Sequence, residues 1–166
     1  PPGATPVYVE SVHPLAPAGP TMYADWAADI SRQPSAGPDG PVRVLLGDFN
    51  ATLDHRTLRD VIDTGYRDAA DAVGKGLVAS WPSSGGFPGL VTIDHVLADE
   101  RIGVRDVEVH SVTASDHRAV LASLTIPPAP NSTPGLLPAF TAKLRPQCPE
   151  PPSRARQPRC YSPVRR

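Results

Sequence analysis

The stretch V-R-V-L-L-G-D-F-N-A-T-L-D, Val42 to Asp54, passes from an apolar segment directly into a polar turn. Residues 42–46 are apolar apart from Arg43, a pattern that predicts a strand covered on both faces. The Gly-Asp-Phe-Asn that follows predicts a tight turn, because Gly, Asp and Asn tolerate left-handed backbone. This turn presents a carboxylate and a carboxamide two positions apart. It is therefore either ordinary turn chemistry or part of a reaction site.

On both sides of this stretch the sequence predicts a mixed α/β protein. The alternation of helical and strand patterns is followed by several strands, and the polar residues gather at strand ends, where rigid strands can direct distant side chains into one site. Strands are expected at residues 7–13, 42–46, 77–81, 90–97, 104–112 and 118–126, and helices at 22–31, 57–63 and 66–73.

The last forty residues differ in composition from the rest of the chain. Residues 127–166 hold eleven prolines and seven Lys or Arg against a single acid, Glu150. They lack the spaced apolar residues that would offset the ordering entropy, so we predict a disordered tail. Residues 1–126, predicted as the one folded domain, carry nine basic and sixteen acidic residues, a net charge of −7. This charge argues against tight nonspecific nucleic-acid binding by the domain.

The sequence gives little direct information on location. Both cysteines, Cys148 and Cys160, lie in the tail and indicate neither a disulfide framework nor a zinc site. No run reaches membrane-spanning length. Arg outnumbers Lys fourteen to two beside abundant Ala and Pro, which is typical of a GC-rich bacterial gene.

Six polar residues at or near strand ends are candidates for a site. Each has a simpler interpretation as a turn, cap or strand-end residue. Asp94 is the hardest to explain in that way, since an ionised carboxylate in a buried strand is costly unless it is paired. The six candidates are His13, Asp48, Asn50, Asp94, Asp116 and His117.

The remaining histidines are given structural places. His55 is expected as a solvent-exposed residue at a helix entry, and His110 as an outward-facing strand residue. His95 follows Asp94, so it should point away from whatever Asp94 faces.

Three motifs, taken in order, resemble the C-terminal motifs of the endonuclease/exonuclease/phosphatase superfamily: GDFNATLD (47–54), TIDHVL (92–97) and SDHRAV (115–120). SVHPLAP (11–17) lies where those enzymes carry a histidine at a strand end. The resemblance extends over residues 7–126. It implies a deoxyribonuclease-I-like fold, an α/β sandwich of two packed β-sheets flanked by helices, with the N-terminal strands missing from this chain.

The resemblance also implies divalent-metal-dependent hydrolysis of a phosphoester. Asp48 would orient or deprotonate the attacking water, or help to hold the metal. Asn50 would hydrogen-bond a phosphoryl oxygen. Asp116 would bind the cation, Mg²⁺ or Mn²⁺, directly or through water, which suits the preference of Mg²⁺ for a few carboxylates and water.

The other three candidates receive roles from the same resemblance. Asp94 would pair with His117 and fix its tautomer, and His117 would contact the scissile phosphate. His13 would lie beside the leaving oxygen as a hydrogen-bond donor or general acid. Pairing with a buried aspartate is a recurrent way to position an imidazole.

The sequence also departs from the family pattern. Relatives begin with a strand that bears an Asn and a segment that bears a metal-binding Glu, and neither can be placed before the His13 strand. Thr92 stands where relatives often carry Arg. Trp81 and Phe87 precede Asp94 and can line a substrate mouth, although a core position for Trp81 is an equal alternative. Because the segments that bear the Asn and the Glu cannot be placed, the chain is expected to be the C-terminal part of a domain.

Three functions remain open from sequence. The main hypothesis is a metal-dependent phosphoesterase, as an incomplete domain, that acts on nucleic acid, a phospholipid or a small phosphodiester without an obligate protein partner. The alternative is a non-catalytic fragment or binding module that keeps the scaffold. The third is a nucleic-acid-binding protein that uses the basic tail. A resemblance to bacterial members tethered by N-terminal membrane helices implies membrane contact only through a preceding segment.

Overall fold

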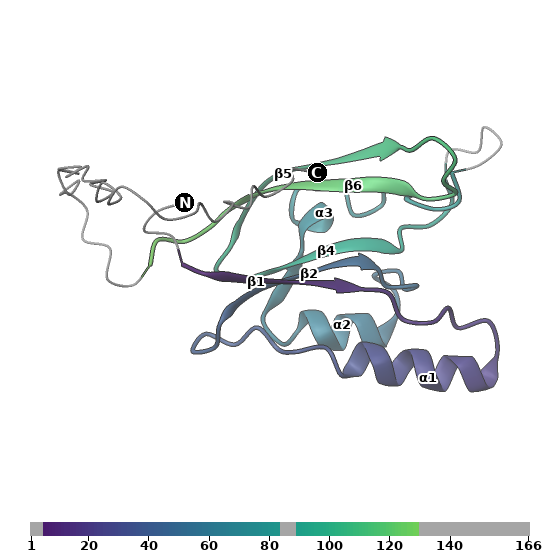
Figure 1. Cartoon of the computed structure of the whole chain (residues 1–166), viewed down its shortest axis with the longest axis horizontal. Coiled ribbons are helices and arrows are strands. Elements are labelled where there is room, and N and C mark those ends of the chain that lie inside the picture. Colours follow the sequence, from purple (N-terminus) through teal and green to yellow (C-terminus); the bar gives the residue numbers. More distant parts are fainter. Residues whose placement is uncertain (1–4, 84–88, 130–166) are drawn as a thin grey trace, which may run out of the picture. The chain divides into compact units, whose positions relative to one another are not determined.

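A computed structural model describes residues 5–83 and 89–129 (Figure 1). The chain divides into two units, residues 1–132 and 133–166, and everything described below belongs to the first. The predicted tail lies outside the described residues from position 130 onward, as does Phe87, so its disorder stays a prediction. Its first residues, Pro127 and Pro128, accept hydrogen bonds from Thr5 through their carbonyl oxygens.

The centre of the fold is a four-stranded sheet in the order β1-β2-β4-β3. Its strands are β1 (Val7–Val12), β2 (Val42–Asp48), β4 (Asp94–Asp99) and β3 (Tyr66–Asp68). β1 runs parallel to β2, and β4 runs antiparallel to both β2 and β3. A parallel pair needs a crossover connection, which helix α1 (Pro20–Ser31) provides between β1 and β2.

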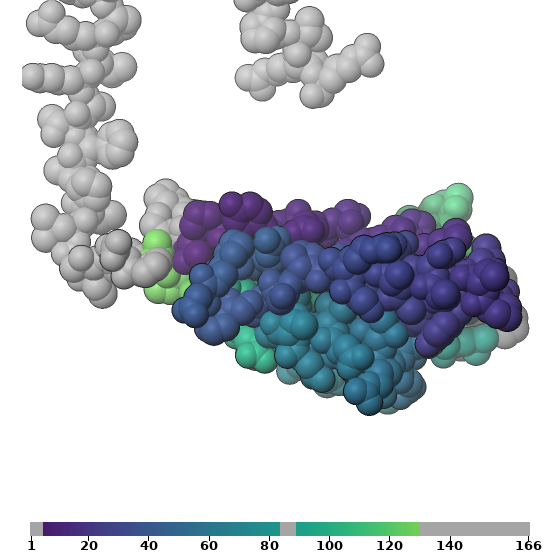
Figure 2. Space-filling model, turned by 90° about the horizontal axis from the view of Figure 1, so that it is seen from below, coloured from purple at the N-terminus to yellow at the C-terminus, as the bar shows by residue number. Residues whose placement is uncertain are grey.

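Two helices cover one face of this sheet, α1 and α2 (Arg56–Ile62). Trp26 of α1 and Leu58 of α2 are fully buried there with Leu45 and Leu97 of the sheet. Figure 2 views the molecule from this side, and the purple-to-teal segments that include both helices form the visible surface. Because strand residues alternate in facing, every second side chain of β2 and β4 points toward these helices.

A second sheet lies over the opposite face, made of β5 (Gly103–Ser111) and β6 (Arg118–Thr125) in antiparallel pairing. The second core lies on this side and includes Val44, Val96 and Val107. The two packed sheets and flanking helices confirm the fold class predicted from sequence. The strands β1, β2, β5 and β6 lie within two residues of their predicted bounds, whereas the segment predicted at 90–97 begins four residues later, at Asp94.

Two element predictions were wrong. Residues 66–73 do not form one helix, because Tyr66–Asp68 pairs with β4 as β3 and only then does the short helix α3 (Ala69–Ala72) begin. Asp68 caps that helix by accepting the Asp71 N–H. Residues 77–81 do not form a strand, since among them only Trp81 makes a bridge, and it is isolated. Pairing with β4 decided the first of these segments, and local pattern does not report such a contact.

The expectation that His55 is solvent-exposed was also wrong. It lies at the start of α2, half-buried, with its ring 5.4 Å from that of Trp26. The Thr52 N–H donates to its Nδ1, which folds the imidazole back against the helix layer. His110 is exposed beside Glu108, as predicted.

Within the described ranges, none of the helices has the length and apolar character that crossing a membrane requires.

Candidate active site

The turn after β2 is held by several backbone hydrogen bonds. Phe49 is fully buried, its N–H donates to the Ile93 carbonyl (2.9 Å), and its carbonyl accepts the indole N–H of Trp26 (2.9 Å). Asn50 takes a left-handed φ of 49°, which Asn tolerates better than most residues. Its N–H donates to Asp48 Oδ1 (2.7 Å). Phe49 thus anchors the turn in the core, with Asp48 and Asn50 on either side of it.

The strand pairing brings His13 beside this turn. Val12 lies opposite Gly47 in the register of β1 and β2. The residues that follow them, His13 and Asp48, are therefore neighbours at the end of the two strands. His13 Nε2 lies 3.7 Å from Asp48 Oδ2, and the His13 side chain is largely exposed. Asn50 Nδ2 donates to the Pro14 carbonyl (3.1 Å). An amide nitrogen carries two hydrogens, so Asn50 keeps one to donate to a ligand.

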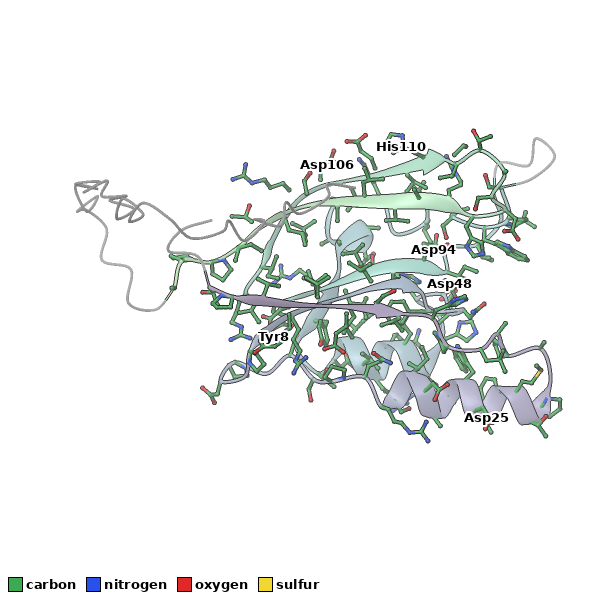
Figure 3. All side chains as sticks on the ribbon, viewed as in Figure 1. Tyr8, Asp25, Asp48, Asp94, Asp106 and His110 are labelled. Atoms are coloured by element: carbon green, nitrogen blue, oxygen red, sulfur yellow. The ribbon has the colours of Figure 1, made fainter. Side chains whose placement is uncertain are left out.

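Asp94 and His117 are paired at the same end of the sheet. Asp94 lies opposite Asp48 in the β2–β4 register, and Figure 3 shows the two acids together, far from Tyr8 on β1. His117 Nδ1 donates to Asp94 Oδ2 (2.9 Å), which leaves Nε2 facing Asp48 Oδ2 at 3.9 Å. This is the pair that the sequence predicted. Ser80 Oγ supports this pair by accepting the backbone N–H of Asp94 (3.1 Å), which fixes the backbone that carries the Asp94 side chain.

Both central groups have perturbed acid–base properties. Burial raises the pKa of Asp48, and the charge of Asp94 adds to this effect, against the opposing influence of the Asn50 N–H and of the nearby imidazoles. Burial works against protonation of His117, yet the hydrogen bond and charge of Asp94, with the charges of Asp48 and Asp116, raise its pKa above the ordinary value. Neighbouring groups with shifted pKa values are typical of functional sites.

Asp116 is linked to the site by the side chain of Trp81, which lies between it and His117 in a chain of contacts. Its Oδ2 accepts the Trp81 Nε1–H (3.3 Å), and the Trp81 and His117 rings lie 6.4 Å apart. The backbone N–H of Ser83 donates to the Asp116 carbonyl (2.6 Å). Trp81 is 37% exposed. Trp81 is therefore not a core residue, and its place at a substrate mouth stays a prediction.

The carboxylates of Asp48 and Asp116 are the type of oxygen ligand that a hard cation such as Mg²⁺ prefers. Mg²⁺ is usually held by one or two carboxylates with water completing its shell. Within the described ranges, the ion-pair partners of Asp48 Oδ2 are the Nε2 atoms of His13 and His117, at 3.7 and 3.9 Å. A closed site of three or more His, Cys, Asp or Glu side chains is not found in residues 5–83 and 89–129. The two carboxylates are therefore of the chemical type that a hydrated cation would use.

A cavity of about 670 Å³ opens between the two sheets and reaches Asp94 and Arg118 at one end. Elsewhere its walls are mostly apolar side chains of β1, β2, β4 and β6, among them Val9, Val44 and Val120. Such walls do not bind a phosphate. The polar chemistry lies at the strand ends beside this cavity.

Sequence reasoning missed the supporting residues. Ser80 is fully buried and its Oγ accepts the backbone N–H groups of both Ile93 and Asp94, each at 3.1 Å. The Ser80 carbonyl also accepts the Arg118 N–H (2.8 Å), which ties together the segments before Asp94 and after His117. A serine before a tryptophan carries no sequence signal for this role.

A two-sheet α/β sandwich with acids and imidazoles gathered at one end defines the deoxyribonuclease-I-like class. The model of the Endonuclease/Exonuclease/phosphatase family matches residues 1–117. The chain belongs to the endonuclease/exonuclease/phosphatase family, as its motifs predicted.

One solved structure with a TM-score above 0.5 supports the fold. A conserved protein of unknown function from Enterococcus faecalis V583 has a TM-score of 0.51 and 14% identity, over 70% of this chain and 49% of that one. A mannosyl-6-phosphatase from Bacteroides thetaiotaomicron VPI-5482 has a TM-score of 0.43 and 17% identity, over 65% and 47%. An endonuclease/exonuclease/phosphatase family protein from Bacteroides thetaiotaomicron has a TM-score of 0.44 and 15% identity, over 69% and 48%. The chain thus spans about half the length of these structures. No curated protein matched.

We expect His117 to titrate above the ordinary histidine value of 6.5, and Asp94→Asn to lower its midpoint. Because its pKa is higher in the folded than in the unfolded chain, protonated His117 stabilises the fold below pH 6.5. That contribution is lost as the pH rises through the folded pKa. The imidazole proton shifts in NMR spectra between pH 5 and 9 give the midpoint. Asp106→Asn, on β5, is the control and should leave it unchanged. A midpoint at or below 6.5, or one that ignores Asp94→Asn, contradicts the pairing.

Proposed function

We propose that this chain carries the phosphate-binding end of a divalent-metal-dependent phosphoesterase. Family membership indicates a phosphoesterase or nuclease type of hydrolase. The observation that supports the finer assignment is the Asp94–His117 pair, whose free Nε2 faces the Asp48 carboxylate. This arrangement places a proton acceptor and an oriented imidazole within one small volume.

Each side chain has a role that its contacts permit. Asp94 holds the His117 ring so that Nε2 meets the phosphoryl group. Asp48 orients or deprotonates the attacking water, and its raised pKa suits a general base better than an ordinary carboxylate does. The free amide hydrogen of Asn50 donates to a phosphoryl oxygen. His13, exposed and 3.7 Å from Asp48, is placed to donate to the leaving oxygen.

The metal belongs to this proposal as well. Asp116, with Asp48, would hold a hydrated Mg²⁺ or Mn²⁺. Such an ion neutralises charge on phosphoryl oxygens, which phosphoryl transfer requires. The substrate class that follows is a phosphodiester or phosphomonoester, whether part of a nucleic acid, a phospholipid or a small molecule.

One observation favours a second candidate, a non-catalytic scaffold or binding module. Among residues 5–83 and 89–129, no group of three or more His, Cys, Asp or Glu side chains is arranged to hold a metal ion. A scaffold of this kind would keep the fold and the Asp–His pair without turnover.

The experiment that separates these functions uses the full chain with bis(4-nitrophenyl) phosphate and 4-nitrophenyl phosphate, with and without Mg²⁺ or Mn²⁺. We expect hydrolysis of at least one ester that requires the metal, and calorimetric Mn²⁺ binding that Asp116→Asn weakens. Asp106→Asn is the matched control, since the Asp106 carboxylate lies on β5 of the second sheet, where it pairs with Lys75. If the folded chain neither binds the ion nor hydrolyses either ester, the proposed enzymatic function is wrong and the non-catalytic scaffold remains.

A further inference from the structure

A second Asp–His pair lies on the opposite face of β4, away from the candidate active site. Asp68 Oδ2 is 2.8 Å from His95 Nδ1, and the two side chains are 2% and 1% exposed. On its other side the same ring approaches the Ala51 carbonyl, with Nε2 at 2.8 Å. Ala51 directly follows Asn50. The imidazole therefore connects the start of α3 to the end of the active-site turn.

The direction of these hydrogen bonds follows from the partners. A carbonyl oxygen only accepts, so His95 Nε2 carries a hydrogen and donates it to Ala51. At Nδ1 either the ring donates to the Asp68 carboxylate or a protonated Asp68 donates to the ring, and both arrangements leave the Nε2 donor in place. Asp68 Oδ1 is held in turn by the Asp71 N–H (2.8 Å). The ring is thus fixed from behind with its donor directed at the turn.

The His95 donor anchors the backbone carbonyl that follows Asn50, whereas Asn50 itself is held through its N–H and its side chain. Phe49 is bonded at both its N–H and its carbonyl, whereas the next anchored carbonyl is that of Ala51. Ala51 is fully buried, so without His95 its carbonyl would lack a partner in the core. Without the His95 bond, the left-handed Asn50 would lose the anchor on the carbonyl that follows it and keep its own bonds to Asp48 and Pro14.

We propose that His95 is a positioning residue for the turn that presents Asp48 and Asn50. Its bond to Ala51 sets the backbone after Asn50, and thereby the directions of the Asn50 amide and the Asp48 carboxylate relative to His117. The kinetic consequence rests on the proposed function. The structural consequence, a fixed turn, does not.

A matched pair of variants tests this role in the full chain. His95→Gln places an amide nitrogen near the position of Nε2 and can still donate to Ala51. His95→Asn places its polar group near Nδ1, where it reaches Asp68 only. Both variants lose the ring and its contact with Phe49, whose centroid lies 5.8 Å away. A purely structural role for the ring predicts equal effects from the two.

We expect the NMR amide resonances of Asn50 and Ala51 to stay near their native positions in His95→Gln. In His95→Asn they should move, and the backbone order parameter of Asn50 should fall from about 0.85 toward 0.6. The kcat for the phosphodiester should drop by about tenfold or more in His95→Asn and by less than about threefold in His95→Gln, with KM little changed, because small displacements of catalytic groups are costly. Measurements are made well below the melting temperature of either variant.

Asp68→Asn serves as the charge control. Its amide can donate to His95 Nδ1 while its oxygen keeps the Asp71 N–H, so the turn resonances should match those of His95→Gln. Equal effects of His95→Gln and His95→Asn on the turn overturn the proposal. A chain that hydrolyses no ester contradicts the proposed function instead, and the NMR comparison still decides whether His95 fixes the turn.

Discussion

Asp94→Asn should nearly abolish phosphoester hydrolysis while the protein stays folded. The asparagine amide has the size of the carboxylate but not its charge, so it no longer stabilises the protonated His117 ring, in which Nδ1 donates to residue 94 and Nε2 keeps a hydrogen for a phosphoryl oxygen. Loss of the orienting aspartate from such a pair lowers kcat by roughly 10³–10⁴-fold in hydrolases that depend on it. We expect a loss of that order in this protein.

The fold should survive because the structural contacts of Asp94 are made by its backbone. Its N–H donates to Ser80 Oγ, and its Cα pairs with Asp48 across the sheet. The measurements are kcat, KM and the melting temperature of the variant, with Asp106→Asn as the control of equal charge change. Activity within tenfold of the native chain, or loss of the cooperative melting transition, would contradict the assigned role.

Gly47→Ala should strongly destabilise the fold, although it adds a single methyl group. Gly47 has a φ of 141°, outside the range that L side chains adopt readily, and a Cβ at this position would lie 2.1 Å from the Val12 carbonyl oxygen. Strained backbone alone costs about 1–3 kcal/mol, and the overlap with a backbone atom adds to it. We expect the free energy of unfolding to fall by about 3 kcal/mol or more.

The same substitution should also disturb the site. Relief of the overlap requires β1 to move away from β2, and that movement carries His13 away from Asp48. Urea denaturation measures the stability change. The control is Gly37→Ala, because a Cβ on Gly37 would meet nothing within 4 Å and should change stability by less than about 0.5 kcal/mol. Equal stability of the two variants would show that β1 and β2 do not approach as closely as described.

The parts of the fold that sequence predicts well are those with a local pattern. The apolar run of β2 and the buried Trp26–Ile30 face of α1 are visible in the order of residues alone. Residues 66–73 are different, because the tyrosine and aspartate of β3 pair with β4, which lies almost thirty positions further along the chain. A propensity for helix gives way there to a contact that no short window contains.

The candidate site divides in a similar way. The six polar residues at strand ends could be selected from sequence, because charged groups in apolar surroundings are conspicuous. The residues that hold these six in place could not be selected from sequence. Ser80 and Trp81 have no pattern that reports on Asp94 or Asp116, and the partner of His95 lies on another strand. A histidine in a strand looks the same in sequence whether it meets water, a carboxylate or a backbone carbonyl.

Adjacent positions of β4 serve opposite faces of one sheet, and this has a consequence for how the strand tolerates insertion and deletion. Asp94 meets His117 on one face, and His95 meets Asp68 on the other. A slip of one residue would send each ionisable side chain to the wrong face, where its partner is absent. A shift in the register of β4 would therefore break both Asp–His pairs together, one on each face of the sheet. β4 should accept changes of side chain far more readily than any change in its length.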